Sequence, residues 1–137
     1  MKLGFAQIQL MNALDNIAKV SAKDCFVEEN SIIFLIPEKN MKQAIGRNGS
    51  TVELLTKKLG KRVELFEYTQ EPEKFFAKAF FKAQIEKVEI KNMKEKKVAI
   101  VQVDSTNRKI ILQNMGRLKR IKELAKRNYS IDEVRVR

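Results

Sequence analysis

The chain of 137 residues is long enough for one medium domain or two small ones, and hydrophobic residues, at 44%, are sufficient to build a core. The absence of histidine and the single cysteine, Cys25, exclude the common zinc sites, histidine-based triads and an internal disulfide. No apolar run approaches the ~20 residues of a membrane span, and a net charge of +11 favours a polyanionic partner. We therefore expect a cytoplasmic protein with no secretory leader, membrane partner, metal or cofactor.

The first half of the chain predicts the order α-β-β-α-α-β. The expected elements are a helix over 3–20, strands over 24–28 and 31–36, helices over 40–45 and 50–59, and a strand over 62–68. Leu3 and Leu14 belong to the buried face of the first helix. The strand over 31–36 is apolar on both faces, which places it in the middle of a sheet. Ser50 is expected to be the N-cap of the helix that follows it, and Gly60 to end that helix.

Between the two short helices lies the sequence Ile45-Gly46-Arg47-Asn48-Gly49. A Gly-x-x-Gly loop has no Cβ at its two glycines, so we expect a nucleic-acid backbone to approach closely there. The first amides of the following helix are free donors at its positive end, and Arg47 adds a full charge. The same residues could form an ordinary turn in which Gly49 supplies a positive φ. The position of the loop within a repeated αββααβ order favours the nucleic-acid interpretation.

The second half repeats this order at an offset of 66 residues. It predicts a helix over 71–82, strands over 84–90 and 97–103, a hairpin turn over 92–96, helices over 105–111 and 115–127, and a strand over 132–136. We therefore expect two domains of one type, over residues 1–70 and 71–137. The phenylalanines of the first helix, Phe75, Phe76, Phe80 and Phe81, are expected to serve in core and interdomain packing.

The second copy departs from the loop motif. At this offset, Gly46-Arg47-Asn48-Gly49 corresponds to Leu112-Gln113-Asn114-Met115, so both glycines are lost. The helix that follows carries six basic residues, which we expect to point outward because Leu118 and Ile121 occupy its buried face. A phosphate-tracking surface would then replace the clamp, although a simple solvated face is the alternative.

The charge is distributed unevenly between the two halves. Residues 1–70 carry 10 Lys and Arg against 8 Asp and Glu, whereas residues 71–137 carry 18 against 9. The second half therefore supplies most of the field that would attract a polyanion. The acidic residues are scattered among lysines, which argues against an enzyme that cleaves nucleic acid with clustered carboxylates and metal ions.

Several segments resemble the archaeal NusA-like proteins. They are residues 21–25, 42–49, 61–64, 68–73 and 124–134. This resemblance covers almost the whole chain, and it implies an α/β fold with two type II KH domains, each a three-stranded mixed sheet packed on helices. It also implies a non-enzymatic factor for transcription elongation, termination or antitermination that binds single-stranded nascent RNA, with RNA polymerase as a candidate partner. A ribosome-associated or rRNA-processing role, and a module that binds an acidic protein, remain alternatives.

The expected RNA contacts follow from the loop, the resemblance and the basic helix. They are Lys42, Ile45, Gly46, Arg47, Asn48, Gly49, Ser50, Asn114, Arg117 and Arg120. We expect amides near the glycines and the Arg47 guanidinium to contact phosphates, and Ile45 to support bases. Members of the family typically carry Gly-x-x-Gly in both domains, so the second domain of this chain departs from the family pattern. We expect the chain to be monomeric.

Overall fold

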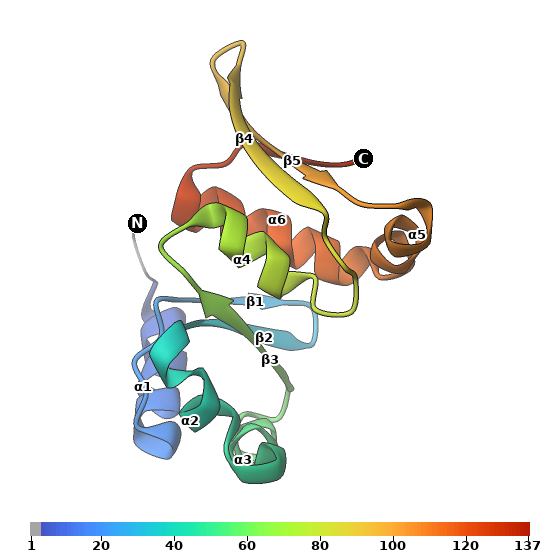
Figure 1. Ribbon diagram of the computed structural model, residues 1–137. Helices are drawn as coiled ribbons and strands as arrows, with labels where there is room; N and C mark the ends of the chain where they lie inside the picture. Colours follow the sequence, from blue (N-terminus) through green and yellow to red (C-terminus); the bar gives the residue numbers. More distant parts are fainter. Residues whose placement is uncertain (1–3) are drawn as a thin grey trace. The chain divides into compact units, whose positions relative to one another are not determined.

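The computed structural model describes residues 4–137, and the chain divides into two compact units, Met1–Tyr68 and Thr69–Arg137. Within the described residues, each unit contains three α-helices and one three-stranded sheet in the order α-β-β-α-α-β (Figure 1). In each sheet the middle strand pairs antiparallel with the strand before it and parallel with the strand that ends the unit. The predicted α/β class and the predicted order of elements are confirmed in both units.

The elements of the first unit follow the prediction closely. They are α1 (Phe5–Ala18), β1 (Asp24–Glu28), β2 (Ser31–Pro37), α2 (Met41–Ile45), α3 (Ser50–Leu59) and β3 (Arg62–Tyr68), with 3-10 turns at Glu38–Asn40 and Arg47–Gly49. Leu3, which was assigned to the first helix, lies outside the described residues. Gly60 ends α3 with φ +70°, and its N–H donates to the carbonyl of Thr56, as expected for a helix C-terminus.

The core of the first unit is built on β2. Six successive residues of this strand, from Ser31 to Ile36, are buried, which confirms its place in the middle of the sheet. Ile32, Phe34 and Ile36 point to the helices, where they pack with Leu14 and Leu55. Each of these buried side chains contributes ~1.5–3 kcal/mol relative to an exposed one. This packing fixes α2 and α3, the helices that flank the Gly-x-x-Gly loop, against one face of the sheet (Figure 1).

The second unit repeats the topology with different lengths. Its elements are α4 (Pro72–Ala79), β4 (Lys87–Met93), β5 (Lys96–Gln102), α5 (Ser105–Gln113), α6 (Met115–Tyr129) and β6 (Glu133–Val136). The prediction of a helix to residue 82 is wrong, because the chain turns at Phe80 so that both Phe80 and Ala83 are buried. Within α6, Leu118, Ile121 and Leu124 form the buried face, as predicted.

The hairpin between β4 and β5 was predicted with too long a turn. Only Lys94 and Glu95 form it, since Met93 pairs with Lys96 and Asn92 with Lys97. Both turn residues have positive φ, 49° and 68°. Two-residue turns of this kind usually carry Asn-Gly or Asp-Gly, so a Lys-Glu pair gives no sequence signal for it.

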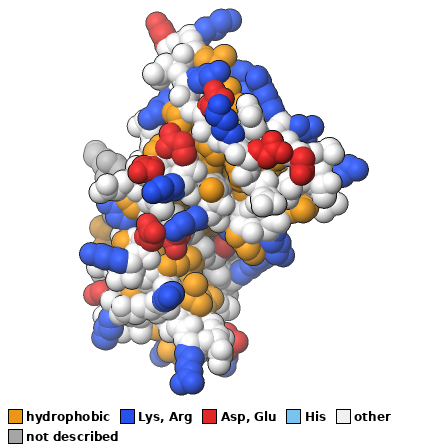
Figure 2. All heavy atoms as spheres, in the orientation of Figure 1, with side chains coloured by type: hydrophobic (Ala, Val, Ile, Leu, Met, Phe, Trp, Pro, Cys, Tyr) orange, Lys and Arg blue, Asp and Glu red, His pale blue; other side chains and the backbone are white. Residues whose placement is uncertain are grey.

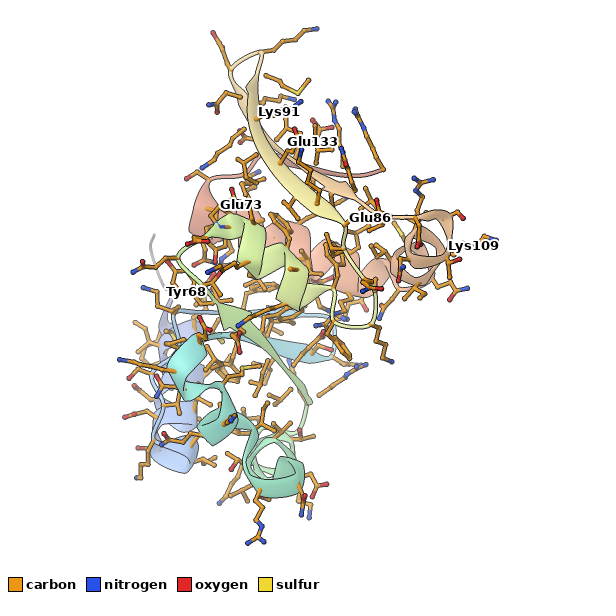
Figure 3. The ribbon with its side chains drawn as sticks, in the orientation of Figure 1. Tyr68, Glu73, Glu86, Lys91, Lys109 and Glu133 are labelled. Carbon is orange, nitrogen blue, oxygen red and sulfur yellow. The ribbon has the colours of Figure 1, made fainter. Side chains whose placement is uncertain are left out.

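The two faces of the second sheet differ in chemistry. One face carries Val88, Ala99 and Val134 toward the helices, whereas the other carries long charged side chains. Lys91 and Glu133 lie on that charged face (Figure 3). Both pair with Val98 of the middle strand, and Val98 is only 1% exposed. The aliphatic stems of these side chains therefore cover the apolar strand while their charged ends remain in water.

Candidate nucleic-acid interface

The Gly-x-x-Gly loop begins where α2 ends. Gly46 has φ 78° and ψ 169°, a backbone conformation that is essentially restricted to glycine, and its N–H donates to the carbonyl of Lys42 at 2.9 Å. A Cβ at this position would collide with Oγ1 of Thr51 and lie 2.7 Å from the Thr51 backbone nitrogen. Gly46 is thus required for the loop to pack on the first turn of α3. Thr51 fills the space that a Cβ of Gly46 would occupy, and the contact of Gly46 with RNA stays a prediction.

The second glycine of the loop faces open space, as was expected of both glycines. Asn48 and Gly49 both adopt left-handed conformations, with φ 55° and φ 76°. The Gly49 amide donates to the carbonyl of Gly46 at 3.2 Å, which closes the turn. A Cβ on Gly49 would meet nothing within 4 Å. The loop is therefore open to an approaching backbone at Gly49.

The tip of the loop presents polar groups outward. Arg47 and Asn48 are exposed, and so are Lys42 and Ser50 on the helices that flank them. The amides of Gly46, Gly49 and Ser50 are used inside the loop, so within the described part of the chain those of Arg47 and Asn48 are the loop amides left to a ligand. These two amides and the Arg47 guanidinium form one cationic, donor-rich tip, which suits a phosphate.

Ile45 and Ser50 lie at the two ends of the loop. Ile45, at the end of α2, is 37% exposed, so an apolar side chain adjoins the polar tip as expected. Ser50, by contrast, is the first residue of α3 and not its N-cap, a position that Gly49 occupies. The prediction of a Ser50 cap is wrong, because the left-handed Gly49 already starts the helix.

One positioning contact gave no signal in the sequence. The Gln43 side chain donates from Nε2 to the carbonyls of Ala18 and Lys19, at 2.9 Å and 3.2 Å. These carbonyls belong to the C-terminal end of α1, where Lys19 takes a left-handed conformation and leaves the helix. Gln43 therefore ties α2, and with it the start of the loop, to the end of α1. A single glutamine on a short helix has no pattern that would predict this.

In the second unit no loop separates the corresponding helices. α5 runs to Gln113, and α6 begins at Met115, so Asn114 alone joins them. The Asn114 side-chain oxygen accepts a hydrogen bond from the Arg117 amide at 3.1 Å, which makes Asn114 the N-cap of α6. The polar groups of the junction are thereby used within the protein. The contact of Asn114 with RNA stays a prediction, and in the structure its side chain caps α6.

The first basic residue of α6 is also engaged within the unit. Arg117 donates from Nε to the carbonyl of Ala79 at 2.9 Å, and its guanidinium carbon lies 4.6 Å from the centre of the Phe81 ring. The expectation that all basic side chains of this helix point outward is wrong for Arg117. Arg120 is half-buried and lies beside Gly116, whereas the exposed cations of the helix are Lys119, Lys122 and Lys126.

On the face shown in Figure 2, Lys and Arg side chains lie among Asp and Glu side chains and do not form one block. Lys87 and Lys91 hydrogen-bond Glu89 and lower the pKa of its carboxyl group. The Asn107 amide donates to Asp104, the N-cap of α5, and lowers the pKa of that carboxyl group. Within residues 4–137, no three His, Cys, Asp or Glu side chains gather as a metal site would require.

Comparison with known proteins defines the class first. A family model described as a KH domain matches residues 10–70, which include the whole Gly46–Gly49 loop. KH domains clamp about four nucleotides with a loop of this type. The fold and the loop thus define the first unit as a KH domain.

The relatives then define the family. The protein named probable transcription termination protein NusA from Halococcus morrhuae is 31% identical over 121 residues, which cover 88% of this chain and 86% of that protein. Proteins of the same name from Methanocaldococcus jannaschii and Methanococcus vannielii are 28% and 25% identical over 99% and 98% of this chain, and 70% and 79% of their own. The chain belongs to this family of archaeal NusA proteins.

A solved structure has a similar fold over nearly the whole chain. The crystal structure of APE1850 matches the chain with a TM-score of 0.89 and 25% sequence identity, over 98% of this chain and 100% of that one. No helix among residues 4–137 has the length and apolar character that crossing a bilayer requires.

Proposed function

We propose that the protein binds single-stranded RNA through the Gly46–Gly49 loop and acts on nascent transcripts as an elongation or termination factor. The KH match and the names of the relatives support this role. The observation that carries it is the loop geometry. Its tip exposes Arg47 and Asn48, and a Cβ at Gly49 would meet only open space.

The loop offers a simple binding mechanism. A phosphate approaches at Gly49, where no side chain obstructs it, and accepts hydrogen bonds from the amides of Arg47 and Asn48. The guanidinium of Arg47 adds a charge-assisted contact. Bases that follow the phosphate lie against the exposed side of Ile45, with their edges read by main-chain groups. Thr51 and Gln43 hold this arrangement without touching the RNA.

The second unit is proposed to be a second KH domain that has lost its clamp. Its element order and strand pairing are those of the first unit, but Asn114 alone joins its two helices. We further propose that the chain is a monomer and a binding protein without catalytic activity, and that RNA polymerase is its protein partner.

Fluorescence anisotropy with a short unstructured RNA tests the loop. About four phosphate contacts, at about −0.7 each, predict a slope near −2.8 for log affinity against log salt concentration. The double variant Arg47→Asp/Asn48→Asp should bind more than about tenfold more weakly than wild type and show a shallower slope. Circular dichroism should show the same fold for both. An unchanged affinity in the folded double variant would contradict the proposal.

A further inference from the structure

We propose that Phe81 and Arg117 form a stacking site for one nucleobase of single-stranded RNA on the second unit. This inference rests on the proposed RNA binding and adds a contact that no Gly-x-x-Gly loop provides. It gives the second unit a way to hold RNA without a clamp. The ligand is a base with its flanking phosphates, in any sequence, since every base has a π face.

Phe81 is exposed in a segment of buried phenylalanines. Phe75, Phe76 and Phe80 are at most 5% exposed, whereas Phe81 is 63% exposed. Phe81 is therefore not part of the core of the second unit, unlike the other three phenylalanines. The chain leaves the helix at Phe80, so that Phe80 turns inward and the next side chain turns outward. An aromatic ring held at the surface in this way buries little area within its own unit.

Arg117 holds the ring in a defined environment. Its guanidinium carbon lies 4.6 Å from the ring centre, which is a cation–π distance. The same side chain is fixed by its Nε hydrogen bond to the Ala79 carbonyl, and its amide is fixed by Asn114. A pre-positioned aromatic ring and guanidinium lose little conformational entropy when a base stacks on them.

The surrounding charge favours a nucleic acid over an apolar partner. Lys82 places its Nζ 5.6 Å from the Phe81 ring centre, so a second cation flanks the ring. The second half of the chain carries 18 Lys and Arg against 9 Asp and Glu. A base brings a phosphate on each side, and these cations complement both. A neutral apolar peptide would leave the cations without counter-charges.

The position of the site also fits the loss of the clamp. Arg117 lies three residues beyond Asn114, the residue that replaces the loop in this unit. The stacking pair thus lies next to the junction where the clamp would otherwise be. The second unit has exchanged phosphate recognition by amides for base recognition by an aromatic ring.

The chain contains no tryptophan, so the variant Phe81→Trp carries its single tryptophan at the site. We would titrate the full-length variant with a short single-stranded RNA and with an abasic oligonucleotide of the same number of phosphates. Stacking predicts that the RNA quenches the fluorescence and that the abasic oligonucleotide does not. Quenching by neither, or equally by both, would overturn the proposal.

Affinities of matched variants complete the test. Phe81→Ala should weaken RNA binding about tenfold and leave the affinity for the abasic oligonucleotide unchanged. Phe81→Trp should retain the wild-type affinity for RNA. Phe5→Ala is the matched control, since Phe5 is 77% exposed in the first unit and should have no effect. Folding of each variant is checked by circular dichroism.

The outcomes separate this inference from the proposed function. If wild type binds RNA and Phe81→Ala binds equally well, the stacking site is overturned while the loop proposal stands. If Phe81→Ala weakens binding and Arg47→Asp/Asn48→Asp does not, the stacking site is supported and the loop proposal fails. If wild type does not bind RNA at all, both are overturned.

Discussion

The two units differ most in the connection between their second and third helices, which are α2 and α3 in the first unit and α5 and α6 in the second. In the first unit, four residues with two glycines form an exposed loop between α2 and α3. In the second unit, Asn114 alone joins α5 to α6 and caps α6 with its own side chain. The strand pairing around these connections is the same.

This difference separates what the fold needs from what the ligand needs. The second unit shows that the αββααβ topology forms without glycines between its helices. The glycines of the first unit thus serve the loop itself, one by fitting against Thr51 and the other by leaving open space. A connection whose polar groups are already used, as at Asn114, has little left to offer a phosphate.

The largest effect should come from the two glycines of the first unit. Gly46→Ala would place a methyl group against Thr51 at φ +78°, which should lower the unfolding free energy by on the order of 3 kcal/mol. Gly49→Ala faces open space at φ +76° and should cost only about 1 kcal/mol. Urea unfolding followed by circular dichroism measures both. Equal losses would contradict the different roles assigned to the two positions.

Charge placed at the two connections should affect RNA binding unequally. Arg47→Asp/Asn48→Asp should weaken binding more than about tenfold, because it removes one phosphate contact and repels others. Gln113→Asp/Asn114→Asp is the matched change in the second unit, and Asp can still cap α6. By anisotropy at ~0.15 M salt, its affinity should fall less than that of the first pair, because the Asn114 side chain is already engaged with the Arg117 amide. A larger loss for the second pair would reverse the comparison.

The residues at the starts of α3 and α6 should differ in their contribution to the unfolding free energy. Asn114→Ala removes the acceptor of the Arg117 amide and should cost about 1 kcal/mol of unfolding free energy, whereas Asn114→Asp should cost less. Ser50→Ala is the control, because Ser50 is not the N-cap of α3. It should leave the unfolding free energy within about 0.5 kcal/mol of wild type. A Ser50→Ala loss as large as that of Asn114→Ala would refute this assignment.

The smallest effect concerns Asp104 and pH. Its pKa lies below the usual value of 3.8 because the Asn107 amide donates to the carboxylate. A carboxyl group whose pKa is lowered by folding stabilises the folded state above its unfolded pKa, and that stabilisation is lost as pH falls through the folded pKa. Asp104→Asn cannot titrate, so its thermal stability should fall less than that of wild type between pH 5 and pH 2. Parallel pH profiles of the two proteins would rule out this contribution.

The sequence was sufficient for most of the first unit. The strands over 24–28 and 62–68 were predicted at their observed bounds, because short apolar runs are bordered there by polar turns and Gly60. The loop was found because two glycines at this spacing interrupt a helical pattern. Its exposed tip follows from the same pattern.

What the sequence missed depends on contacts between distant residues. Two such contacts are the packing of Thr51 against Gly46 and the hydrogen bond from Gln43 to the end of α1. Each is made by a single polar residue that belongs to no periodic sequence pattern. Phe81 and Arg117 were misplaced because apolar and basic residues were assigned to the inside and the outside by type. The turn of the chain at Phe80 reverses both assignments, and only the packing of the second unit determines that turn.

Amide chemical shifts in the full chain test the central claim most directly. A short single-stranded RNA would be titrated into uniformly ¹⁵N-labelled protein, with every amide followed separately. We expect the largest changes at Arg47, Asn48 and Gly49, and a second group of smaller changes around Phe81 and Arg117. Large changes at Gln113 and Asn114 with an unperturbed Gly46–Gly49 loop would contradict the claim.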